Sequence, residues 1–180
     1  MTDLFAIDPG VKTCATALSR ASRLVSIASM PSFVAPTRHA PHCAVIWELP
    51  QTRGNESVPG DDLIALTHAG ADLARAIAGR DMSIRAVTPR QWKGSAPKPV
   101  HHGRLWDALC FGEDELIGGS RTIVAIKAAQ ERGAADGWRK PGATYYRARE
   151  LPTVDGVKIT HDLLDAVALL MFGLGRLAGP

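Results

Sequence analysis

Four acidic residues lie in apolar stretches of this sequence, where carboxylates are rarely found without a partner. Asp8 and Glu48 each end a short apolar run that is typical of a buried strand. Asp162 and Asp165 lie three residues apart in an otherwise apolar stretch, so on a helix they would point from the same face. The spacing therefore predicts that four carboxylates could converge from two strand ends and one helix.

Converging carboxylates repel one another, and a divalent cation removes that repulsion. Oxygen ligands without soft donors favour Mg²⁺ or Mn²⁺ over zinc. Taken singly, each acid has an ordinary explanation: a turn residue at Asp8, a solvated strand end at Glu48 and a helix cap at Asp162. Taken together, they predict a metal site, and we expect the metal-free protein to be at least as stable when any one of them loses its charge.

Short apolar runs and helical periods indicate the elements that must position these acids. Strands are predicted at residues 4–8, 13–18, 24–30, 43–48 and 83–87, and helices at 61–78, 100–111, 121–132 and 162–177. This order is typical of a mixed α/β plan with one central sheet. Because no linker is visible, we expect residues 1–180 to form a single domain.

The composition is that of an ordinary globular chain, with 180 residues, 46% hydrophobic and 22% charged. A net charge of +3 does not by itself establish a nucleic-acid partner, although Lys and Arg cluster at 80–104 and 132–149. The three cysteines form no CxxC pair, which excludes a zinc ribbon. No apolar stretch approaches the roughly 18 residues of a membrane span, so we expect no membrane association and a cytoplasmic location.

Four segments, in this order along the chain, resemble the motifs of the RuvC-type Holliday junction resolvases, which belong to the RNase H-like nuclease superfamily. They are Phe5-Ala6-Ile7-Asp8-Pro9-Gly10, Trp47-Glu48, Pro89-Arg90-Gln91-Trp92-Lys93-Gly94-Ser95-Ala96-Pro97-Lys98 and Asp162-Leu163-Leu164-Asp165-Ala166. Each motif alone is of limited specificity, but the ordered set spans residues 4–170.

The resemblance implies an RNase H-like α/β fold, with a mixed central five-stranded sheet flanked by helices. It implies phosphodiester hydrolysis with two Mg²⁺ ions per active site, for which Mn²⁺ substitutes, and products with 5′-phosphate ends. Asp8 would bridge the two ions, because it comes from the central strand, and Glu48, Asp162 and Asp165 would complete the ligand set. Lys93 and Lys98 would bind backbone phosphate or stabilise the charged transition state.

Four-way or branched DNA would be the substrate, and a two-fold homodimer would make the two symmetric cuts. The resemblance places the dimer interface on helix 61–79, which carries small residues at Ala65, Ala69, Gly70, Ala71 and Ala74. The alternative is that these residues pack on the sheet. Arg139, Lys140 and Arg147 form a second basic run, interleaved with Trp138, Tyr145 and Tyr146, that could bind DNA through cations and stacked aromatics.

The sequence also departs from the family pattern. Residues 133–160 form a segment that a compact member would lack, and no aromatic follows Glu48 to stack on an opened base. Three alternatives stay open. They are an RNase H-like nuclease acting on flaps or other branched DNA, a non-catalytic junction-binding protein, and an actin-like ATPase domain, for which 180 residues leave little room.

Overall fold

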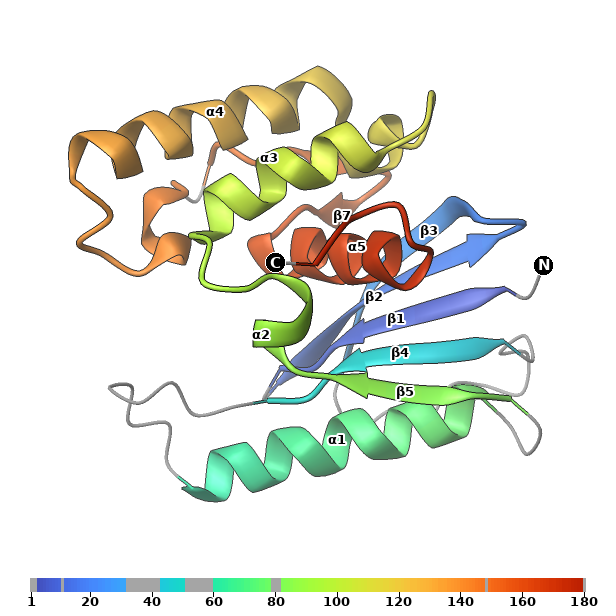
Figure 1. Cartoon of the computed structure of the whole chain (residues 1–180). Coiled ribbons are helices and arrows are strands. Elements are labelled where there is room, and N and C mark those ends of the chain that lie inside the picture. Colours follow the sequence, from blue (N-terminus) through green and yellow to red (C-terminus); the bar gives the residue numbers. More distant parts are fainter. Residues whose placement is uncertain are drawn as a thin grey trace.

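A five-stranded mixed sheet lies at the centre of the computed structural model, in the order β3-β2-β1-β4-β5 (Figure 1). The structure describes residues 3–10, 12–31, 43–50, 60–78, 82–147 and 149–179. The strands are β1 (Leu4–Asp8), β2 (Thr13–Arg20), β3 (Arg23–Pro31), β4 (Ala44–Glu48) and β5 (Ile84–Val87). The predicted mixed α/β class, with five strands flanked by helices, is confirmed.

The pairing of β1 brings two of the predicted acids to one edge of the sheet. β1 runs antiparallel to β2 and parallel to β4, with Ile7 opposite Trp47 in the parallel pair. The next residue on each strand is Asp8 or Glu48, so both carboxylates leave the sheet at the same end. β5 continues the sheet beside β4 in parallel register and ends at Val87, opposite Glu48.

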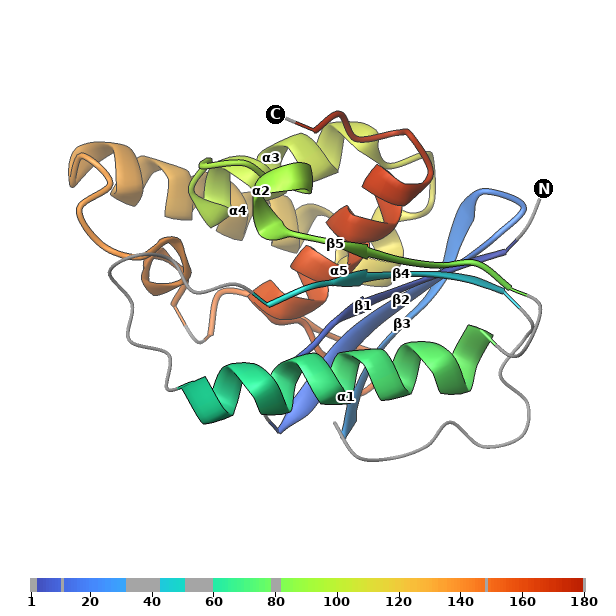
Figure 2. The same cartoon turned by 60° about the horizontal axis from the view of Figure 1, so that its bottom comes forward.

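Helices cover both faces of this sheet (Figure 2). α1 (Gly60–Ala78) lies against one face, while α5 (His161–Gly173) lies against the other and is covered in turn by α3 (Lys98–Ala108), which packs on α4 (Gly119–Ala135). The remaining elements are the short α2 (Pro89–Trp92), the 3₁₀ turns η1 (Asp114–Ile117) and η2 (Gly142–Tyr145), and a hairpin of β6 (Thr153–Val154) and β7 (Val157–Lys158).

α5 explains why the last apolar stretch of the sequence has no clear polar side. It lies between the sheet and α3, and every residue from Leu163 to Met171 is buried. Thr160 begins the helix by accepting a hydrogen bond from the backbone of Leu163 through its side chain, at 3.2 Å. The helix ends at Gly173, four residues before the predicted boundary at 177. Within the described part of the chain, no helix is long and apolar enough to span a membrane.

Three of the five small residues of α1 pack on the sheet, which is the alternative to their forming a dimer interface. Ala69, Gly70 and Ala74 are buried against the chain's own sheet, so they do not form a free face for a partner. A Cβ atom on Gly70 would lie 2.7 Å from the ring of Trp47, which explains why a residue without a side chain occupies this position. The outward face carries Ile64, which is 58% exposed, beside the exposed Ala65.

Candidate active site

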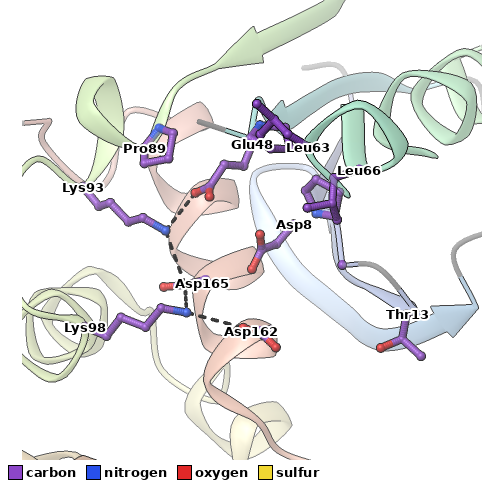
Figure 3. Close-up of a pocket in the computed structure, with 13 residues that line it drawn as sticks. Asp8, Thr13, Glu48, Leu63, Leu66, Pro89, Lys93, Lys98, Asp162 and Asp165 are labelled. Carbon is purple, nitrogen blue, oxygen red and sulfur yellow. Dashed lines mark hydrogen bonds and ion pairs between the residues drawn. The ribbon is translucent and has the colours of Figure 1, made fainter. Parts of the chain in front are cut away.

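Three of the four predicted carboxylates meet at the end of β1. Asp8 closes that strand, and Asp162 and Asp165 lie in the first two turns of α5, which packs across β1. One ligand atom from each of the three aspartates lies within 4.8 Å of the other two. Figure 3 shows the Asp8 carboxylate facing these helix residues across an open pocket. The i, i+3 spacing on the helix and the strand end therefore converge as the sequence predicted.

Glu48 lines the same pocket but has different neighbours. Its Oε2 atom accepts a hydrogen bond from the indole nitrogen of Trp92 at 2.9 Å and lies 2.9 Å from Nζ of Lys93. Among the described residues, the close group of possible metal ligands contains the three aspartates and not Glu48. Glu48 is thus held at the edge of the cluster by partners from the α2 region.

The two predicted lysines are ion-paired with the carboxylates. Nζ of Lys93 lies between Glu48 and Asp165, 3.4 Å from the latter, and its side chain is only 6% exposed. Nζ of Lys98 lies 2.7 Å from Asp165 and 3.4 Å from Asp162, and this side chain is 27% exposed (Figure 3). Burial lowers the pKa of both lysines, but the adjacent carboxylates outweigh it and raise both, so both carry a proton.

Asp8 and Asp165 respond oppositely to this environment. Burial, followed by the charges of Glu48 and Asp165, raises the pKa of Asp8 well above its usual range. Burial would raise the pKa of Asp165 too, but Lys93, Lys98 and a hydrogen bond from His102 hold it well below its usual range. Both ammonium groups therefore pair with Asp165, whereas no ion pair of the described residues involves Asp8.

The chemistry of this donor set fits a divalent cation. Four carboxylates face two ammonium groups in one pocket, which leaves the fully ionised site with an excess of negative charge. The ligand atoms of Asp8, Asp162 and Asp165 are hard oxygens close enough to share one ion. Cobalt, copper or zinc sites commonly use imidazole or thiolate ligands, and none belongs to this close group. The donors therefore suit Mg²⁺ or Mn²⁺.

A second layer of side chains, to which the sequence analysis assigned no role at the metal site, surrounds the aspartates. Nε2 of His102 lies 2.9 Å from Oδ1 of Asp165, and Nδ1 of the same ring lies 2.7 Å from the hydroxyl of Tyr146. Nδ1 of His161 lies 2.7 Å from Asp162. Trp92, which holds Glu48, is fully buried. The adjacent histidines 101 and 102, in a helix next to the lysine motif, are a sequence signal for this layer, whereas Tyr146 was predicted to stack on bases.

The second basic run lies away from the pocket. Arg139, Lys140 and Arg147 are exposed but do not line it. The interleaved aromatics contact the chain itself: Trp138 packs edge-on against Tyr145, and Tyr146 contacts His102. Tyr145 is buried, whereas Trp138 and Tyr146 are half-buried, so base stacking by these two stays a prediction. DNA binding by the three cations stays a prediction.

Among solved structures, the chain is similar to RuvC structures. One, of T. thermophilus RuvC in complex with a Holliday junction substrate, is 13% identical with a TM-score of 0.43, and the match covers 97% of this chain and 94% of that one. Another, of Thermus thermophilus RuvC, is 14% identical with a TM-score of 0.40, covering 96% and 93%. The sequence matches no family model and no curated protein.

Proposed function

We propose that the chain is a metal-dependent endodeoxyribonuclease that resolves four-way DNA junctions. The observation that carries this proposal is the convergence of Asp8, Asp162 and Asp165 within 4.8 Å, in a pocket that also contains Glu48 and two lysines. Carboxylates arranged around a divalent cation, with ammonium groups beside them, are suited to phosphoryl chemistry on a polyanion. The junction as substrate comes from the ordered motifs rather than from the pocket.

In this proposal Asp8, Asp162 and Asp165 hold the metal, with Glu48 at the edge of the ligand set. When bound, two ions would activate a water molecule and stabilise the leaving 3′ oxygen, which gives products with 5′-phosphate ends. Lys98 is the more exposed of the two lysines, so it is the better placed to bind a DNA phosphate. Lys93 keeps the Glu48 carboxylate beside the cluster through its 2.9 Å ion pair.

Cutting a junction symmetrically requires two sites, so we propose a two-fold homodimer. Because Ala69, Gly70 and Ala74 of α1 face the sheet, an interface on this helix would use its outward side, where Ile64 and Ala65 are exposed. An exposed isoleucine on a helix next to alanine is compatible with an apolar contact between copies. The dimer would hold two pockets on opposite strands of one junction.

The test is incubation of the purified chain with a four-way junction, a flap and a linear duplex, each with Mg²⁺ or Mn²⁺. We expect paired nicks in the junction and little cutting of the duplex. Asp162→Asn should abolish cleavage, whereas the matched control Asp155→Asn, in the β6–β7 turn, should leave it unchanged. Preferred cutting of the flap would indicate a branched-DNA nuclease instead. Metal-independent junction binding without cutting of any substrate would indicate a non-catalytic binding protein and contradict the proposal.

A further inference from the structure

A buried chain of hydrogen bonds runs from Asp165 to a segment remote from it in the sequence. Oδ1 of Asp165 lies 2.9 Å from Nε2 of His102, and Nδ1 of His102 lies 2.7 Å from the hydroxyl of Tyr146. Asp165 is 1% exposed and His102 is fully buried. Water is therefore excluded from the contact between Asp165 and His102, while the Tyr146 end of the chain is half-buried.

For a neutral His102 ring, counting donors and acceptors gives the position of each proton along this chain. An ionised aspartate can only accept, so Nε2 of His102 donates to Asp165. A neutral imidazole then offers Nδ1 as an acceptor, and the Tyr146 hydroxyl donates to it. Burial lowers the pKa of His102, although Asp165 opposes this, and burial together with the Asp165 charge raises the pKa of Tyr146. Both shifts agree with a neutral ring and a protonated hydroxyl.

These contacts fix the plane of the Asp165 carboxylate. Nε2 of His102 contacts Oδ1, while Nζ of Lys98 and Nζ of Lys93 lie 2.7 and 3.4 Å from Oδ2. A ligand carboxylate whose outer partners fix its rotation presents its lone pairs in one direction. Within this arrangement Tyr146 sets the orientation of the His102 ring, because it holds the nitrogen opposite to the one that contacts Asp165.

Tyr146 is itself held by a well-anchored segment. The neighbouring Tyr145 is buried, donates to Asp136 at 2.8 Å and packs edge-on against Trp138. Arg132, near the end of α4, donates to the backbone oxygen of Tyr145 at 3.0 Å. These contacts tie the segment to α4 and leave Tyr146 directed at His102 on the adjacent α3.

We propose that His102 and Tyr146 are positioning residues that orient Asp165 for metal binding, and that this is what residues 133–147 contribute to the site. The inference rests on the proposed function, because it assumes that Asp165 is a metal ligand. It assigns to the segment that departs from the family pattern a specific task inside the pocket, through one tyrosine hydroxyl.

The experiment measures Mn²⁺ binding to the full chain by electron paramagnetic resonance, well below the unfolding temperature and without DNA. His102→Leu should weaken Mn²⁺ binding by about 10–100-fold, the usual effect of losing such an outer partner. Tyr146→Phe removes one hydrogen bond and should weaken binding by roughly 2–10-fold. His102→Gln keeps an amide donor near the position of Nε2 and should recover most of the loss. Thr144→Val, which removes a neighbouring exposed hydroxyl that donates to the backbone oxygen of Pro141, is the matched control and should bind like the parent.

Several results would overturn the inference. Unchanged Mn²⁺ affinity in Tyr146→Phe and His102→Leu, in a parent that binds Mn²⁺ and cuts junctions, would remove the positioning role and leave the proposed function intact. An equal loss in Thr144→Val would mean that the segment matters only as a support. If His102→Leu does not fold, Tyr146→Phe and His102→Gln decide. A parent that binds no Mn²⁺ would overturn both the inference and the proposed function.

Discussion

Replacing Asp8 or Asp165 by asparagine should change the stability of the metal-free protein in opposite directions. The ion pairs of Lys93 and Lys98 go to Glu48, Asp162 and Asp165, and burial together with the nearby carboxylates raises the pKa of Asp8. Asp8→Asn removes a charge that is poorly compensated. Asp165→Asn removes the charge that balances two lysines, so we expect it to destabilise the metal-free protein. Repulsion among the carboxylates alone would predict no loss of stability at this residue.

The size of each effect follows from burial. A buried polar group without adequate compensation costs about 1–3 kcal/mol, so Asp8→Asn should raise the free energy of unfolding by that amount. Removing one partner of a buried ion pair costs about 3–5 kcal/mol. Because Asp165 is only 1% exposed, solvent does not weaken its ion pairs much, so Asp165→Asn should lower the free energy of unfolding by about that amount. For a chain of this size, each kcal/mol shifts the unfolding temperature by roughly 2–4 °C. The unfolding temperature of Asp8→Asn should therefore lie measurably above that of the parent, and the unfolding temperature of Asp165→Asn measurably below it.

The assay is thermal unfolding followed by circular dichroism in a chelator, repeated at several pH values. The raised folded-state pKa of Asp8 means that its ionisation destabilises the fold above the unfolded-state value of about 4, so the Asp8→Asn gain should be present at neutral pH and disappear in acid. The lowered pKa of Asp165 has the opposite sign: its stabilisation is present at neutral pH and lost in acid, so the Asp165→Asn deficit should shrink there.

Adding Mg²⁺ supplies the control. A ligand that binds only the folded state stabilises it, so the parent should gain more from Mg²⁺ than either variant. An Asp8→Asn variant that is less stable than the metal-free parent at neutral pH would refute the account of the charge balance. A gain that persists unchanged in acid would show that the effect does not come from ionisation of Asp8.

Three further outcomes are expected. Lys98→Ala should weaken junction binding and reduce the slope of log affinity against log salt by about one unit, measured by fluorescence anisotropy, and an unchanged slope would return Lys98 to a purely structural role. Ile64→Glu should yield a monomeric mass by light scattering and single nicks, whereas a persistent dimer would place the interface elsewhere. Glu113→Gln should lower the free energy of unfolding, measured in urea, by about 1–3 kcal/mol, because the Glu113 carboxylate accepts hydrogen bonds from Arg176 and from the backbone of Leu24 and Cys110. Cleavage per folded molecule should not change, and an unaltered urea midpoint would count against this network.

Local sequence patterns were sufficient for the strands and for the acids that end them. Short apolar runs bounded by turn residues predicted all five strands of the main sheet to within a few residues. Parallel pairing then brings the ends of β1 and β4 together, so Asp8 and Glu48 could be placed at one edge without knowing any contact. The i, i+3 spacing of Asp162 and Asp165 worked for the same reason, because helix geometry alone fixes a common face.

The second layer could not be predicted, because it depends on how α3 and the 133–147 segment dock. A histidine in a helix gives no sign of which neighbour its nitrogens will meet, and Tyr146 lies 44 residues from His102. The small residues of α1 are an ambiguous dimer signal for a related reason. Small side chains permit close approach to any surface, and here that surface is Trp47 of the same chain.

The division of the aspartates between β1 and α5 has a consequence for chain synthesis. Asp8 is made first, but its partners Asp162 and Asp165 follow only after every strand of the main sheet and α1, α3 and α4. A growing chain can therefore pair its N-terminal strands on the ribosome while the ligand set is still incomplete. Because α5 must emerge and pack across β1 before the aspartates meet, a prematurely terminated product would carry Asp8 and Glu48 without Asp162 and Asp165. The order of residues along the chain would thus delay the proposed DNA-cutting activity until almost the whole described fold exists.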